Sequence, residues 1–124
     1  MRAPELLAGW RVVARPEAID ALVAPPGGAV LRIAPDDAIV SGIAGIDVDD
    51  PHAIVEPEYA FVHWKLAPSE FAEVERHIEW PLPRRGQLGQ GLIAGVPAKI
   101  AIEDDHVVLV VSASLAHELM ERLW

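Results

Sequence analysis

The sequence holds few residues whose type and spacing could do chemistry, and the metal-like patterns among them are incomplete. His117 and Glu121 stand four residues apart, which brings two side chains to one face of a helix. A zincin motif carries a second histidine where this chain has Glu121, so the pair indicates a solvated helix face. The acidic residues Asp47, Asp49 and Asp50 lack the spacing, glycine and bidentate glutamate of a calcium loop. The sequence therefore predicts no metal site.

An anion site is the most specific binding prediction. Arg84 and Arg85 form the only adjacent basic pair of the chain, and guanidinium groups bind carboxylate and phosphate well. Gly91 closes the glycine-rich stretch that follows them. The glycine spacing differs from the dinucleotide fingerprint, so the expected ligand is an anion of another kind. A surface turn is the competing interpretation of the same stretch.

Nucleophilic catalysis has little support in the sequence. The chain has no cysteine, and its four serines lie outside a Gly-x-Ser-x-Gly elbow and outside a Ser-x-x-Lys motif. His63, on a predicted strand beside Lys65, is a candidate ligand-binding residue, with a plain surface position as the alternative. A base formed by His63 with Glu56 or Glu58 is the one enzymatic alternative. We predict no catalytic residue and favour a non-enzymatic role.

The composition fits one globular domain over residues 1–124. Hydrophobic residues make up 52% of the chain, whereas a disordered chain is poor in them. The net charge of -9 is the opposite of the basic footprint of a nucleic-acid-binding protein. No apolar run approaches the roughly 20 residues of a membrane span, and the first residues lack the apolar region of a signal peptide. We expect a cytoplasmic protein that binds neither nucleic acid nor membranes.

The first half of the chain predicts short elements, because many of its eleven prolines and nine glycines punctuate it. Proline at the first helical position and apolar residues at helical spacing predict a helix over 16–24. Apolar and β-branched runs predict strands over 10–15, 29–34 and 38–41, the last two forming a hairpin. The stretch 42–57, rich in Asp, Gly and Pro, is expected to be irregular.

The second half predicts the order strand, helix, strand, strand, helix, and with it the fold class. The apolar run 106–111 is typical of a central strand that is buried on both faces. We predict an α+β fold, with a mostly antiparallel sheet, helices packed on one face and a ferredoxin-like duplication of two strand-then-helix units. The expected elements are strands at 59–66, at 92–102 with an interruption at 95–97, and at 106–111, helices at 68–80 and 112–124, and a loop at 81–91.

Three of the four tryptophans are candidate interface residues. Trp80 and Trp124 fall at the ends of the two predicted helices, and Trp64 lies on the predicted strand before the first of them. Aromatic side chains that reach the surface are enriched at protein interfaces. Packing of these rings in the core is the competing explanation.

Several strings of the chain carry a family resemblance. They are Ala60–Leu66, Gln90–Ile100 and Val107–Ala116, followed by an amphipathic segment that ends in Leu123-Trp124, with Leu31–Asp37 as an early strand and turn. Together they resemble the N-terminal half-domain of the glycine-cleavage T-protein superfamily, nearest to its sarcosine oxidase gamma-subunit branch. The resemblance covers about two-thirds of the chain.

The resemblance implies a ferredoxin-like fold and, in catalytic members, tetrahydrofolate binding with one-carbon chemistry. The stretch that corresponds to the family's carboxylate pair reads Val96-Pro97-Ala98 and has no acid, and Ser112 stands where an asparagine often follows the last strand. We therefore expect a non-catalytic domain that forms a homo-oligomer or joins a larger oxidoreductase-like or methyltransferase-like subunit. Binding of a folate-like or other anionic small molecule is the alternative, and folate is the only cofactor suggested.

Overall fold

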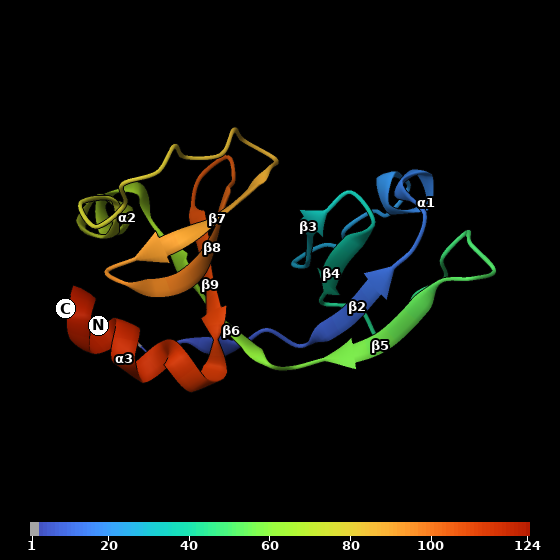
Figure 1. Cartoon of the computed structure of the whole chain (residues 1–124), viewed down its shortest axis with the longest axis horizontal. Coiled ribbons are helices and arrows are strands. Elements are labelled where there is room, and N and C mark those ends of the chain that lie inside the picture. Colours follow the sequence, from blue (N-terminus) through green and yellow to red (C-terminus); the bar gives the residue numbers. More distant parts are fainter. Residues whose placement is uncertain (1–2) are drawn as a thin grey trace. The chain divides into compact units, whose positions relative to one another are not determined.

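The computed structural model describes residues 3–124, which divide into two compact units (Figure 1). We call Leu7–Tyr59 the N-terminal unit, and Ala60–Trp124 with the residues through Leu6 the C-terminal unit. Each unit builds its own sheet. The expectation of a single domain over residues 1–124 stays a prediction.

The N-terminal unit is a four-stranded sheet in the order β3-β4-β2-β5, with one helix. Val12 on β2 and Val40 on β4 face a buried cluster that Ala18 and Ile19 of the helix complete. The predicted hairpin is confirmed, since β3 and β4 pair antiparallel. The elements are β2 (Gly9–Val13), α1 (Pro16–Asp20), β3 (Ala29–Ala34), β4 (Asp37–Ser41) and β5 (Ile54–Glu58).

The stretch 42–57, expected to be irregular, in fact contains most of the edge strand β5. This strand pairs with β2 from Val13 opposite Ile54 to Gly9 opposite Glu58. Pro57 lacks the N–H that a ladder needs, and an edge position tolerates that loss. The prediction was wrong because Glu and Pro are poor strand formers, whereas pairing with β2 overrides the local preference.

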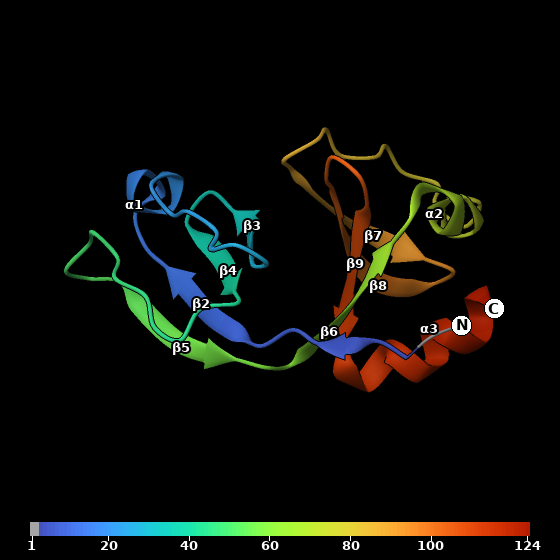
Figure 2. The same cartoon turned by 180° about the vertical axis from the view of Figure 1, so that it is seen from behind.

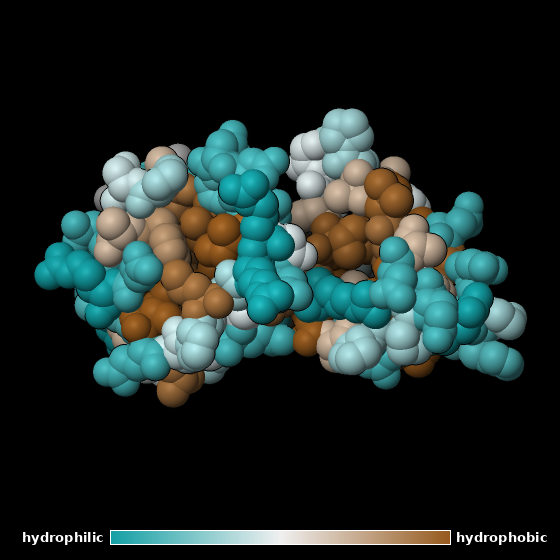
Figure 3. Space-filling model, turned by 90° about the horizontal axis from the view of Figure 1, so that it is seen from above, coloured by the Kyte–Doolittle hydropathy of each residue, from teal (hydrophilic) through white to brown (hydrophobic). Residues whose placement is uncertain are grey.

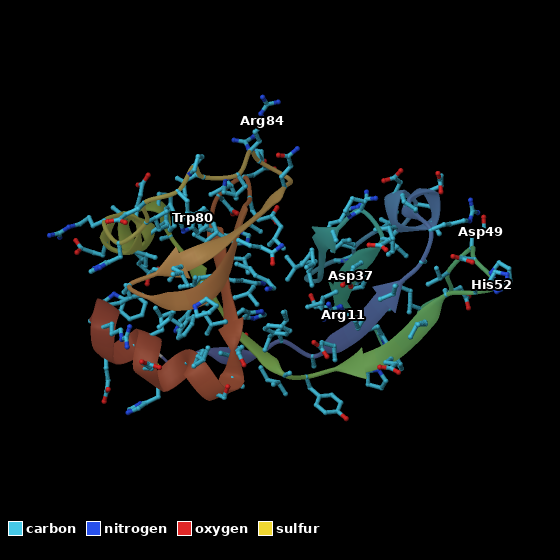
Figure 4. The ribbon with its side chains drawn as sticks, in the orientation of Figure 1. Arg11, Asp37, Asp49, His52, Trp80 and Arg84 are labelled. Atoms are coloured by element: carbon cyan, nitrogen blue, oxygen red, sulfur yellow. The ribbon has the colours of Figure 1, made fainter. Side chains whose placement is uncertain are left out.

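Arg11 links three strands of the N-terminal unit. Its Nε and Nη2 donate hydrogen bonds to the two carboxylate oxygens of Asp37 on β4, at 2.5 and 2.6 Å (Figure 4). Its Nη1 lies 3.6 Å from Oε1 of Glu58 on β5. The hydrogen bond with Asp37 raises the pKa of the Arg11 guanidinium, against a smaller opposing effect of burial. Such a bidentate pair fixes geometry, so Arg11 holds β4 and β5 beside β2.

The C-terminal unit is a five-stranded sheet in the order β1-β6-β9-β8-β7 with two α-helices (Figure 2). Trp64, Ile100 and Leu109 of the sheet lie in one buried cluster with Phe71 of α2 and Leu119 of α3, so both helices cover the same face. The elements are β1 (Glu5–Leu6), β6 (Phe61–Leu66), α2 (Pro68–Glu75), β7 (Leu88–Ile93), β8 (Val96–Ile102), β9 (Val107–Ser112), the 3-10 helix η1 (Ala113–Leu115) and α3 (Ala116–Leu123).

The predicted α+β class is confirmed, with antiparallel ladders in both sheets. The apolar run is the central strand β9, which lies between β6 and β8 and is buried from Val107 to Val111. The two strand-then-helix units are β6–α2 and β9–α3, and their strands are antiparallel neighbours. A ferredoxin-like sheet instead contains split βαβ units with parallel strands, so the resemblance to a duplication lies in the element order alone.

β7 and β8 form a hairpin where one interrupted strand was expected. Ala94 and Gly95 connect them, with φ of 49° and 82°, as the two central residues of a type I′ turn require. Nη1 of Arg122 on α3 donates a hydrogen bond to the Ala94 carbonyl at 2.7 Å. The usual sequence of such a turn is Asn-Gly or Asp-Gly. Because Ala94 stands at the first position instead, the sequence did not indicate a turn here.

Trp80 covers β7, because α2 ends at Glu75 and the chain then turns back to the sheet. The indole Nε1 donates a hydrogen bond to the Leu92 carbonyl at 2.8 Å. A Cβ at Gly91 would lie 2.5 Å from indole Cε2, and one at Gly89 would lie 3.0 Å from indole Cζ3. Gly89 and Gly91 therefore leave a strip of β7 without side chains, on which the indole ring lies. Packing against Trp80 explains why glycine stands at both positions.

Replacing Gly91 by alanine should destabilise the protein by about 1–3 kcal/mol, because the new Cβ would overlap the Trp80 indole and displace it. Urea unfolding followed by tryptophan fluorescence measures the loss. Gly45→Ala is the control, since a Cβ at Gly45 meets nothing within 4 Å. Equal unfolding midpoints for the two variants would show that packing of Trp80 does not require a glycine at position 91.

Candidate functional site

The four predicted ligand-binding residues lie in different places. Arg84 stands in the exposed loop between α2 and β7, where Figure 4 shows its side chain pointing away from the fold. Arg85 lies in the same loop, and its Nη1 pairs with Asp104 at 3.0 Å. Gly91 is on β7, and His63 is on β6, with β8 and β9 between them in the sheet. The sheet thus separates His63 from Gly91.

His63 occupies a small hollow of about 210 Å³ on β6, lined in part by Glu5 and Lys65. Its Nε2 lies 3.6 Å from Glu5 Oε2. Its Nδ1 is buried and has no hydrogen-bond partner among the described residues. Burial lowers the pKa of the imidazole, Glu5 opposes this shift, and Lys65 adds to it. Glu58, proposed as a partner in a catalytic base, pairs with Arg11 within the N-terminal unit.

The lowered pKa of His63 should make stability pH-dependent. The unfolded chain takes up a proton as the pH falls through the ordinary value of 6.5, whereas the native state resists protonation. The free energy of unfolding should therefore fall from about pH 7.5 to about pH 5.5, and it should fall less in His63→Gln. Urea unfolding at the two pH values measures the difference.

His77→Gln, at an exposed position just after α2, is the control for losing a histidine. If His63→Gln loses as much stability as the wild type over this pH range, the native state does not resist protonation of His63.

A second hollow opens where β8 and β9 separate. The ladder between these strands stops at the pair Lys99 and Val110. Beyond it, β8 stays paired with β7 back to Val96, and β9 stays paired with β6 up to Ser112. Pro97, which cannot donate to a ladder, falls in the stretch of β8 without a partner in β9. The opening holds about 260 Å³ and is called the β8–β9 hollow below.

The β8–β9 hollow combines mainly apolar walls with three polar side chains. Lys99 Nζ lies 5.4 Å from the centre of the Phe61 ring and donates a hydrogen bond to Gln90 Oε1 at 3.1 Å. Ser112 adds a hydroxyl, whose oxygen lies 3.1 Å from that of Ser114. Among the described residues that line the hollow, Lys99 is the only charged one. An ammonium against an aromatic face, beside apolar walls, can attract an anion.

Of the residues that line the β8–β9 hollow, the sequence pattern marks Gly91 as part of an anion site but does not mark Lys99, Phe61 or Ser112. Lys99 is the single charged residue of the otherwise apolar strand β8. This interruption of the apolar pattern was the one feature of the sequence that could have indicated a binding residue here. Nothing in the local pattern shows that β8 and β9 part beside it, because strand register is set by tertiary pairing.

The three candidate interface tryptophans differ in exposure. Trp64 is only 2% exposed and belongs to the core. Trp124 is 41% exposed, and its ring centre lies 6.2 Å from that of Trp64. Trp80 is half-buried against β7. Core packing therefore explains Trp64, whereas Trp124 presents an aromatic surface.

The acidic loop of the N-terminal unit is tied to Arg15. Asp50 accepts hydrogen bonds from the backbone N–H groups of Arg15 and His52, at 2.8 and 2.9 Å, and these bonds lower its pKa. The Arg15 guanidinium also donates to the carbonyl of Asp49 at 2.9 Å. Within residues 3–124, no group of three or more histidines and carboxylates is placed to hold a metal ion.

No helix in the described part of the chain is long and apolar enough to cross a membrane. No protein-family model, curated protein or solved structure matches the chain.

Proposed function

We propose that the C-terminal unit binds a small anionic molecule in the β8–β9 hollow and has no catalytic role. The observation that carries the proposal is the ammonium of Lys99, which lies over Phe61 in a mainly apolar opening between strands. Ligand sites typically combine apolar walls with a few placed polar groups. Attraction between opposite charges is also stronger in such surroundings than in bulk water.

The size of the hollow favours a compact ligand. Its volume of about 260 Å³ is just below the roughly 300–1,000 Å³ of pockets that hold drug-sized molecules. Folate, which the family resemblance suggests, is a molecule of that larger class and would protrude. We therefore propose a smaller anion as the ligand.

Compact anions should raise the melting temperature of the protein. A ligand at ten times its Kd stabilises the native state by about 1.4 kcal/mol, which shifts the midpoint by a few degrees. A thermal-shift panel of acetate, benzoate, phosphate and folate at millimolar concentration makes the measurement. Lys99→Met should abolish the shift, whereas Lys65→Met, at the only other lysine, should keep it. If no anion in the panel stabilises the wild type, the proposed function fails.

Self-association is a second candidate function, supported by apolar side chains exposed on the C-terminal unit. Leu6 on the edge strand β1 is 56% exposed, and Trp124 after α3 is 41% exposed. Figure 3 shows apolar surface between hydrophilic side chains on the face of the molecule that it views. We propose a second copy of the chain as the occupant, because most soluble oligomers are symmetric assemblies of one chain.

Replacing Leu6 by lysine should then dissociate the oligomer, because the charge would be buried without a partner. Light scattering coupled to size exclusion measures the mass against the 13.4 kDa of one chain. Val23→Lys is the control, since Val23 is 82% exposed in the N-terminal unit. A wild-type mass of one chain at all concentrations would contradict self-association and would leave a larger partner subunit as the remaining form of the association hypothesis.

A further inference from the structure

We infer that the ligand of the β8–β9 hollow is a monocarboxylate with a flat apolar body, that is, an aromatic acid. This inference rests on the proposed function and narrows it to one chemical class. Three features of the hollow lead to it: a single charged side chain, two donor side chains in the lining, and a lining that is otherwise mainly apolar and aromatic.

The charge of the site matches one carboxylate. Lys99 is the only charged residue among the described ones that line the hollow. Arg85, a better phosphate ligand, is paired with Asp104 elsewhere. A phosphate monoester carries nearly two negative charges and three acceptor oxygens, which would exceed what one ammonium neutralises. A carboxylate carries one charge, so its charge balances that of Lys99.

The donors of the site suit two acceptor oxygens. Ser112 stands directly opposite Phe61 in the β6–β9 ladder, and the Lys99 ammonium lies over the Phe61 ring. Ser112 and Lys99 are therefore both neighbours of Phe61 in the lining of the hollow. A carboxylate has two oxygens, one of which can accept a charge-assisted bond from the ammonium while the other accepts from the hydroxyl.

The apolar lining of the site favours an aromatic body. Phe61, Leu92, Pro97 and Leu115 line the hollow. An aromatic ring can pack on the Phe61 ring and on these apolar side chains, whereas a saturated ring lacks the aromatic pairing with Phe61. The apolar body of an aromatic acid would therefore lie against these side chains while its carboxylate meets Lys99.

The test is calorimetric titration of the full chain with 2-naphthoate. We expect saturable binding that is roughly ten- to hundredfold weaker for 2-naphthamide, which has the same shape without the charge. Cyclohexanecarboxylate, which has the charge without the flat ring, and phenyl phosphate should also bind more weakly than 2-naphthoate. Chemical-shift changes in ¹⁵N spectra should centre on Lys99, Ser112 and Leu115.

Variants locate the site. Lys99→Met should weaken 2-naphthoate binding roughly ten- to hundredfold, and Lys99→Arg should retain most of it because the positive charge remains. Lys65→Met should bind like the wild type, because Lys65 does not line this hollow. The melting temperature of each variant shows whether it is folded.

The possible results of these titrations distinguish failure of the aromatic-acid inference from failure of the proposed function. Tighter binding of phenyl phosphate or cyclohexanecarboxylate, lost in Lys99→Met, would overturn the aromatic-acid class and leave the proposed function standing. Equal binding of 2-naphthoate and 2-naphthamide, or unchanged binding of 2-naphthoate by a folded Lys99→Met, would overturn the inference and its site. Absence of binding by every anion would overturn both the inference and the proposed function.

Discussion

The C-terminal unit depends on where the ladder between β8 and β9 stops. That ladder includes the pair Lys99 and Val110 and goes no further, while each strand continues beside its other neighbour. Side chains alternate along a strand, so the same register places Ile100 in the core and Lys99 on the opposite face. A slip of one residue would bury the ammonium and expose the isoleucine, at a cost of several kcal/mol. The register that builds the core thus also builds the hollow.

The outer neighbour of β8 must also be fixed for the hollow to exist. β7 is the edge strand of the sheet, and an unprotected edge is prone to alternative pairing. The Trp80 indole lies on its alternate glycines and donates to the Leu92 carbonyl, so one ring both packs on β7 and uses a backbone acceptor of the strand. At the turn of the hairpin, the Arg122 guanidinium of α3 donates a hydrogen bond to the Ala94 carbonyl. β7 and the start of β8 can therefore stay together while β8 leaves β9.

Local patterns predicted the elements whose residues match their environment. The strand 29–34 coincides with β3, and the apolar run 106–111 became the central β9, because burial on both faces selects an unbroken apolar strand. β5 and the β7–β8 hairpin were missed, since pairing with β2 overrides Glu and Pro, and Ala94 is an unusual residue at positive φ. Gly91, predicted to belong to an anion site, makes room for Trp80 and also lines the β8–β9 hollow. The β8–β9 hollow could not be predicted, because it depends on two strands parting and not on any local motif.

The distribution of charge in this chain favours anion binding through direct contact over long-range electrostatic attraction. The net charge is -9, so an approaching anion is repelled by the chain as a whole, and salt at physiological strength screens that field over roughly 8 Å. The only two lysines, Lys65 and Lys99, stand opposite Val108 and Val110 of β9, and therefore on one face of the sheet. Lys99 is the half-buried one, with an aromatic ring beneath it. In the proposed site, recognition of an anion would therefore depend on direct contact with Lys99, and the apolar side chains around it would strengthen the attraction between the ammonium and the anion.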